Sequence, residues 1–96
     1  MNELRVEVTA FSSTKSQTDN TPFIAASGKR VYDGMVAANF LPFGTKIKMP
    51  ELFGDKIFTV DDRMNKRYQN RVDIWFSSTG SALKFGVKNT VIEVVG

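Results

Sequence analysis

Two carboxylates in this 96-residue chain could do chemistry together, and both lie within residues 58–76. Asp62 closes one short apolar run, and Asp73 stands inside the next one. A carboxyl group donates a proton near neutral pH when burial or a nearby like charge raises its pKa. A proton donor with a second acid near it is a common arrangement for cleaving a glycosidic bond. A solvated strand face, or an ion pair with Arg63 or Arg71, is the alternative interpretation.

Strand periodicity predicts how the two acids are presented. In the first run Asp62 falls on the same face as Phe58 and Val60, whereas Asp73 falls on the face opposite to its apolar neighbours. The polar loop between the runs returns the chain beside itself. We therefore expect the two carboxyl groups on adjacent strands of one open groove, titrating in two coupled steps.

The rest of the chain predicts short strands separated by turns. The strands are expected at residues 4–11, 35–40, 46–49, 56–62, 71–76 and 87–95. Ser77 or Ser78 would cap a short helix that Gly86 ends. This pattern indicates an all-β domain, a six-stranded closed barrel with one short helix, spanning residues 1–96. Its expected core is Val6, Val8, Ile47, Ile57, Val60, Val72, Ile74, Leu83, Val91 and Val94.

Composition narrows the function classes. A hydrophobic content of 42% with eight Phe indicates a folded domain, and a net charge of +3 without a basic run argues against nucleic-acid binding. The absence of Cys and His removes thiol and Ser–His catalysis and the usual transition-metal ligands, so we expect no metal and no cofactor. No stretch is long and apolar enough for a membrane span, and no signal-peptide pattern is present.

Other side chains have both a binding and a structural interpretation. Trp75 and Tyr68 could stack on sugar rings or pack in the fold. Arg63, Arg67 and Arg71 could contact acidic groups of a substrate or pair with the local aspartates.

Further acids and one long loop also have two interpretations. Asp61 is interpreted as a solvated or strand-end acid, and Asp19 and Asp33 as turn residues. The loop 12–22 is a flexible surface loop or the mobile rim of a groove.

Several segments resemble one family. Thr9-Ala10-Phe11-Ser12, Ala26-Ser27-Gly28 and the sequence of residues 36–45 are similar to segments of rare-lipoprotein-A-like barrels and three-aspartate (3D) domains. Val60-Asp61-Asp62-Arg63, followed by residues 70–76, resembles the signature of the 3D domain, and residues 81–87 resemble its helix end. The resemblance covers roughly residues 6–95.

The resemblance implies a double-psi β-barrel related to membrane-bound lytic transglycosylase A and to expansins. It implies a groove for a peptidoglycan strand, with Asp73 as acid/base, Asp62 as its supporting acid and Thr9 in the groove. It also implies a bacterial protein of the cell envelope or a secreted one, and we expect a monomer. One departure is that Asn39 or Phe40 stands where the family has its first aspartate. An amide can hydrogen-bond but cannot ionise, so Asn39 is expected to bind substrate and not to act as an acid.

Three functions therefore stay open. The first is a lytic transglycosylase that forms 1,6-anhydro-muramyl ends. The second is a non-catalytic, polysaccharide-binding barrel of the expansin kind, and the third is a structural or interaction barrel.

Overall fold

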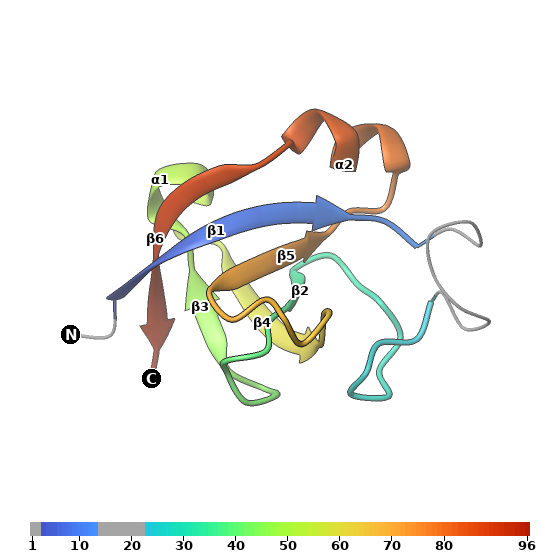
Figure 1. Ribbon diagram of the computed structural model, residues 1–96, viewed down its shortest axis with the longest axis horizontal. Coiled ribbons are helices and arrows are strands. Elements are labelled where there is room, and N and C mark those ends of the chain that lie inside the picture. Colours follow the sequence, from blue (N-terminus) through green and yellow to red (C-terminus); the bar gives the residue numbers. More distant parts are fainter. Residues whose placement is uncertain (1–2, 14–22) are drawn as a thin grey trace.

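The computed structural model describes residues 3–13 and 23–96. Its strands are β1 (Glu3–Phe11), β2 (Met35–Ala37), β3 (Lys46–Lys48), β4 (Ile57–Asp62), β5 (Arg71–Trp75) and β6 (Lys88–Val95). Two short helices, α1 (Pro50–Phe53) and α2 (Thr79–Phe85), lie outside the strands (Figure 1). Neither helix of the described residues has the length and apolar character needed to cross a membrane.

The six strands close into a barrel with the order β1-β5-β2-β4-β3-β6. The pairs β1–β5 and β2–β4 are parallel, and the other neighbouring pairs are antiparallel. Exchanging β1, β2 and β3 for β4, β5 and β6 leaves this set of pairs unchanged. The barrel is therefore two interlocked three-stranded units, and the predicted all-β, six-stranded double-psi architecture is confirmed.

Alternating strand positions fill the barrel interior, as predicted for most of the core. The expected residues that are fully buried are Val6, Val8, Ile47, Val60, Val72 and Ile74, and Val94 packs against them. The other members of this interior are Val36, Ala38, Met49, Phe58 and Ile92.

Three of the core predictions are wrong. In β6 the buried positions are Thr90 and Ile92, so Val91 points the other way. Ile57 is 40% exposed because it begins β4 at the end of the barrel. Leu83 is 75% exposed, since α2 turns Ala82 toward the barrel instead.

The two helices close the barrel through aromatic contacts. Phe53 of α1 packs edge-on against Phe58 and is stacked on Phe85 of α2, which in turn meets Phe76 edge-on. The Ser78 side chain accepts a hydrogen bond from the Ser81 N–H, as predicted for a helix cap.

Some element boundaries differ from those predicted. Helix α1 was not expected; Pro50 at its first turn suits a helix start, and Gly54 with φ of +60° ends it. Strand β2 ends at Ala37, earlier than predicted, although the next N–H, that of Ala38, still donates to the Asp62 backbone carbonyl. The predicted mobile rim beyond Ser13 lies outside the described residues.

Core packing leads to a first prediction. Ile74→Ala should lower the free energy of unfolding by about 2–5 kcal/mol, because it removes buried methyl groups and leaves a cavity. Leu83→Ala is the matched control and should change it by less than about 0.5 kcal/mol, since that side chain is exposed. Denaturant unfolding followed by circular dichroism measures both. Equal losses in the two variants would show that the assigned interior is wrong.

Candidate active site

The register of four strands places the two candidate acids in one row. Thr9 of β1 pairs with Asp73 of β5, Asp73 pairs with Ala37 of β2, and Ala37 pairs with Asp62 of β4. Side chains directly opposite one another in a sheet share a face. Since the neighbours of Asp73, Val72 and Ile74, point into the core, this row lies on the outer face of the barrel.

The prediction that the two acids lie on adjacent strands is wrong, because β2 lies between β5 and β4. Two strand spacings separate their backbones by roughly 9–10 Å. The residue between them is Ala37, which is buried, with 2% of its surface exposed. The carboxyl groups still interact, because the negative charge of Asp62 contributes to raising the pKa of Asp73.

A shift of register explains how Asp62 comes to face outward. Val36 pairs with Val60, but the next residue, Ala37, pairs with Asp62, so Asp61 is passed over. Such a bulge re-aims the side chains that follow it. The prediction that Asp62 shares a face with Phe58 and Val60 is therefore wrong: those two are buried, and Asp62 joins the outer row.

Asp73 has the environment of a proton donor. Burial raises its pKa to about 6 from 3.8, although a hydrogen bond from Thr9 and the charge of Arg71 act in the opposite direction. Thr9 Oγ1 donates to Asp73 Oδ1 over 2.8 Å. Among the described residues this is the one hydrogen bond that the Asp73 side chain makes, so Oδ2 is left for a proton.

Asp62 is held differently, by backbone donors. The N–H groups of Ala26 and Arg63 both donate to its Oδ1, over 2.8 Å and 2.9 Å. These two donors hold the Asp62 carboxyl group in place two strands away from Asp73.

Asp61, expected to be solvated, is instead 1% exposed. Its Oδ2 accepts a hydrogen bond from the Tyr32 hydroxyl and lies 3.6 Å from Lys29 Nζ. Burial, together with the hydrogen bond to Asp61, raises the pKa of Tyr32 to about 12. A period-two pattern cannot reveal this burial, because the register shift interrupts it.

Two residues predicted to bind substrate hold loops of the chain. Arg63 Nη1 donates to the carbonyls of Ala38 and Leu41, over 2.6 Å and 2.9 Å, and its guanidinium lies 4.0 Å from the centre of the Phe43 ring. Arg63 therefore fixes the turn that follows β2.

Asn39 fixes the loop that follows β4. Its amide donates to the carbonyls of Asn65 and Tyr68, and its Oδ1 accepts from the Met64 N–H. Both ends of this side chain are therefore used within the protein.

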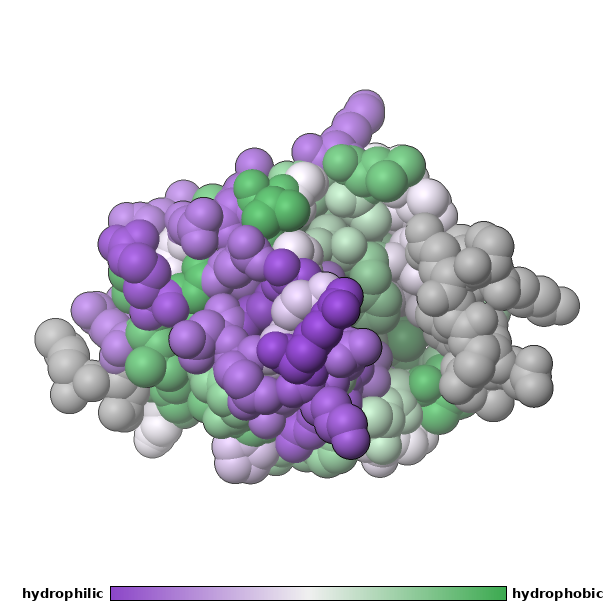
Figure 2. Space-filling view, in the orientation of Figure 1, coloured by the Kyte–Doolittle hydropathy of each residue, from purple (hydrophilic) through white to green (hydrophobic). Residues whose placement is uncertain are grey.

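The β4–β5 connection presents charged and aromatic groups to solvent. Figure 2 shows hydrophilic side chains gathered over this connection. Tyr68 lies between the guanidinium groups of Arg67 and Arg71, which are 4.9 Å and 4.0 Å from its ring centre. A hydrogen bond from Arg67 lowers the pKa of Tyr68, and Arg71 also pairs with Glu7.

Trp75 lies two positions after Asp73, on the same side of β5, and its indole N–H donates to Ser13 Oγ over 2.9 Å. A hollow of about 320 Å³ adjoins it, lined by Asp33, Trp75, Phe76, Ser77 and Ser81. An aromatic ring with hydroxyl and carboxylate groups near it is a lining that suits a polar ring such as a sugar. Of this lining only Trp75 had been predicted as a sugar contact; Ser77 had been considered as a cap of α2, and Ser81 only as part of the segment that resembles the family's helix end.

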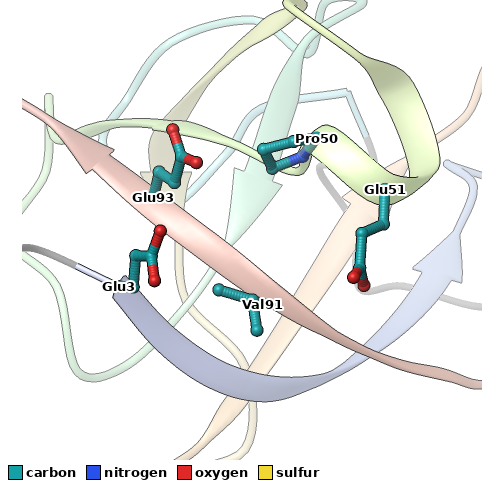
Figure 3. A pocket seen from close by; sticks show the side chains of 5 residues that line it. All are labelled: Glu3, Pro50, Glu51, Val91 and Glu93. Atoms are coloured by element: carbon teal, nitrogen blue, oxygen red, sulfur yellow. The ribbon is translucent and has the colours of Figure 1, made fainter.

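A second hollow, of about 290 Å³, lies between β1, α1 and β6 and is lined by Glu3, Pro50, Glu51, Val91 and Glu93 (Figure 3). Its carboxylates would repel an anionic ligand, and Glu51 already accepts a hydrogen bond from Thr90. No group of described residues has the composition to hold a metal ion.

No protein-family model matches the chain, and no curated protein matches it.

The raised pKa of Asp73 makes a stability prediction. Asp73 ionises more readily in the unfolded chain than in the folded one. The free energy of unfolding should therefore fall as pH rises from about 4 through about 6. Asp73→Asn keeps the shape and an acceptor for Thr9 but cannot ionise. It should therefore raise the free energy of unfolding by about 1–3 kcal/mol near pH 7.5 and leave it nearly unchanged near pH 4.

Denaturant unfolding at the two pH values measures this difference. Asp55→Asn, at an exposed turn position, is the control and should give no comparable pH-dependent gain. An Asp73→Asn variant that is no more stable at the higher pH would contradict a desolvated carboxyl group at this position.

Proposed function

We propose that the chain cleaves the glycan strands of peptidoglycan as a lytic transglycosylase, with Asp73 as its acid/base. The observation that supports this most is the row Thr9–Asp73–Ala37–Asp62 on the outer face of the barrel. It combines a desolvated carboxyl group, whose pKa is about 6, with a second carboxylate held in place by backbone N–H groups. The resemblance of the two strands to the 3D-domain signature supports the same assignment.

One acid/base is sufficient for this reaction. The protonated Asp73 gives its proton to the glycosidic oxygen as the bond from that oxygen to the sugar C1 breaks. The carboxylate then takes the proton of the C6 hydroxyl, whose oxygen bonds to C1 and closes a 1,6-anhydro ring. The negative charge of Asp62 would stabilise the positive charge that develops at C1. No attacking water has to be positioned.

The surroundings of the row suggest how a glycan strand would lie. Along β5 the outer face leads from Asp73 to Trp75 and the hollow beside it, which would accept a neighbouring sugar. The cations of the β4–β5 connection would attract the acidic peptide stems of peptidoglycan. Such a strand would extend over the barrel surface without entering a closed cavity.

A polysaccharide-binding barrel without catalysis is the second candidate. It is favoured by the missing first aspartate of the family, at whose place Asn39 or Phe40 stands; the Asn39 amide is bound to the backbone at both ends. If that aspartate is needed for the reaction, the groove would bind glycan without cleaving it.

Activity of two variants tests the catalytic assignment. Asp73→Asn should reduce glycan cleavage at least about 10³-fold, because it removes the proton donor, and it should leave glycan binding within a few-fold. Asp62→Asn should reduce cleavage less, because the donor remains and only a supporting charge is lost. The measurements are clearing of purified cell walls and mass spectrometry of anhydro-muropeptides.

If the wild-type protein binds cell walls but releases no anhydro-muropeptide, the catalytic proposal is wrong and the binding function stands. Lysis that persists in Asp73→Asn would remove Asp73 from the mechanism.

A further inference from the structure

Asp61 is the one fully buried charged residue among those the structure describes. The proposed cleavage does not use it, because its side chain points away from the outer row. A buried carboxylate is unfavourable unless it is paired. The groups that pair with Asp61 therefore indicate what this residue does.

These groups all belong to one segment, residues 25–32, which is called the clamp segment below. Lys29 and the Tyr32 hydroxyl both reach Asp61 Oδ2. Near the other end of the segment, the Ser27 N–H donates to the Asp61 backbone carbonyl over 3.1 Å. Asp61 is thus fastened to the clamp segment through both its side chain and its backbone.

The clamp segment is also a tight turn of its own. The Ala25 N–H donates to the Lys29 carbonyl over 2.8 Å, and the Gly28 N–H donates to the Ala25 carbonyl over 2.9 Å. Gly28 has φ of +91°, a conformation that favours glycine. This turn directs the Ala26 N–H at Asp62 Oδ1, 2.8 Å away.

We infer that Asp61 is a positioning residue, which fixes the clamp segment so that its Ala26 N–H orients the neighbouring Asp62 carboxylate in the groove. The inference rests on the proposed function for its effect on cleavage only, since the hydrogen bonds exist without substrate. Two consecutive aspartates thereby bind one segment: Asp61 holds it through its side chain and its backbone carbonyl, and Asp62 receives its Ala26 N–H.

Amide hydrogen exchange of Ala26, followed by NMR of the free protein, tests this directly. Asp61→Asn removes the charge that Lys29 and Tyr32 bind, so exchange at Ala26 should become at least about tenfold faster. The Ala26 amide proton resonance should also move upfield as its bond to Asp62 weakens. Tyr32→Phe removes one hydroxyl group and is the milder variant, for which the same changes are expected at smaller size.

Asp33→Asn is the matched control, because it lies next to the clamp segment but its exposed carboxylate binds Lys56. It should leave exchange at Ala26 unchanged within about twofold. If Asp61→Asn does not fold, Tyr32→Phe decides the question alone. Unchanged Ala26 exchange and resonance position in the folded variants would overturn the inference.

Kinetics separate this inference from the proposed function. If the wild type is active, Asp61→Asn should lower kcat by about tenfold or more, and Tyr32→Phe should lower it by a smaller factor. KM should stay within about twofold in both variants, because the carboxylate is misplaced and the binding surface is kept. A rise in KM with kcat unchanged would overturn the positioning role. If the wild type does not cleave glycan, the proposed function fails, and the Ala26 measurement still decides whether Asp61 holds the clamp segment.

Discussion

The shift of register between β2 and β4 is the constraint on which the site depends. Without it, strict alternation would continue from Phe58 and Val60, turning Asp62 into the core and Asp61 outward. With it, Asp61 is buried under the clamp segment and Asp62 lines up with Ala37 and Asp73. One irregular step in a parallel strand pair therefore supplies both the outward carboxylate and the buried one that holds the neighbouring segment.

The three central acids illustrate three ways of keeping a carboxyl group in a small fold. Asp61 is buried and paired with a hydroxyl and an ammonium group, and Asp62 is held by two backbone N–H groups. Asp73 has a single hydrogen bond from the residues that the structure describes and is desolvated, so its ionisation works against folding. The closed barrel tolerates this because every strand is paired on both sides and the apolar interior is continuous. A desolvated acid on the outer face of such a barrel lowers the stability of the fold, and functional sites often contain groups of this kind.

Strand periodicity predicted the barrel and the interior of β1 and β5 correctly, because alternation there is regular. It failed at β4, where the register shift interrupts the period, and at β6, where Val91 and Ile92 are equally apolar and only the pairing decides which one points inward. Residue type suggested substrate contacts for Arg63 and Asn39, yet their partners are backbone groups of the 38–41 and 64–68 loops. These partners depend on how turns that are distant in the sequence meet in the fold, and the local sequence pattern contains no information on that. Thr9 and Asp73 are 64 positions apart, and only the family resemblance suggested that they share a groove.

The internal symmetry of the barrel relates the four positions of this row in pairs. Exchange of the two three-stranded units carries β1 onto β4 and β2 onto β5, so it reverses the row Thr9–Asp73–Ala37–Asp62. Thr9 then corresponds to Asp62, and Asp73 to Ala37. The backbone thus offers two equivalent central positions, but an acid occupies one and a methyl group the other. A second acid in place of Ala37 would stand directly beside Asp73, where like charges disfavour ionisation of the pair. Ala37 instead keeps one strand between the two acids, and its buried methyl group places an apolar neighbour beside the carboxyl group whose pKa burial raises.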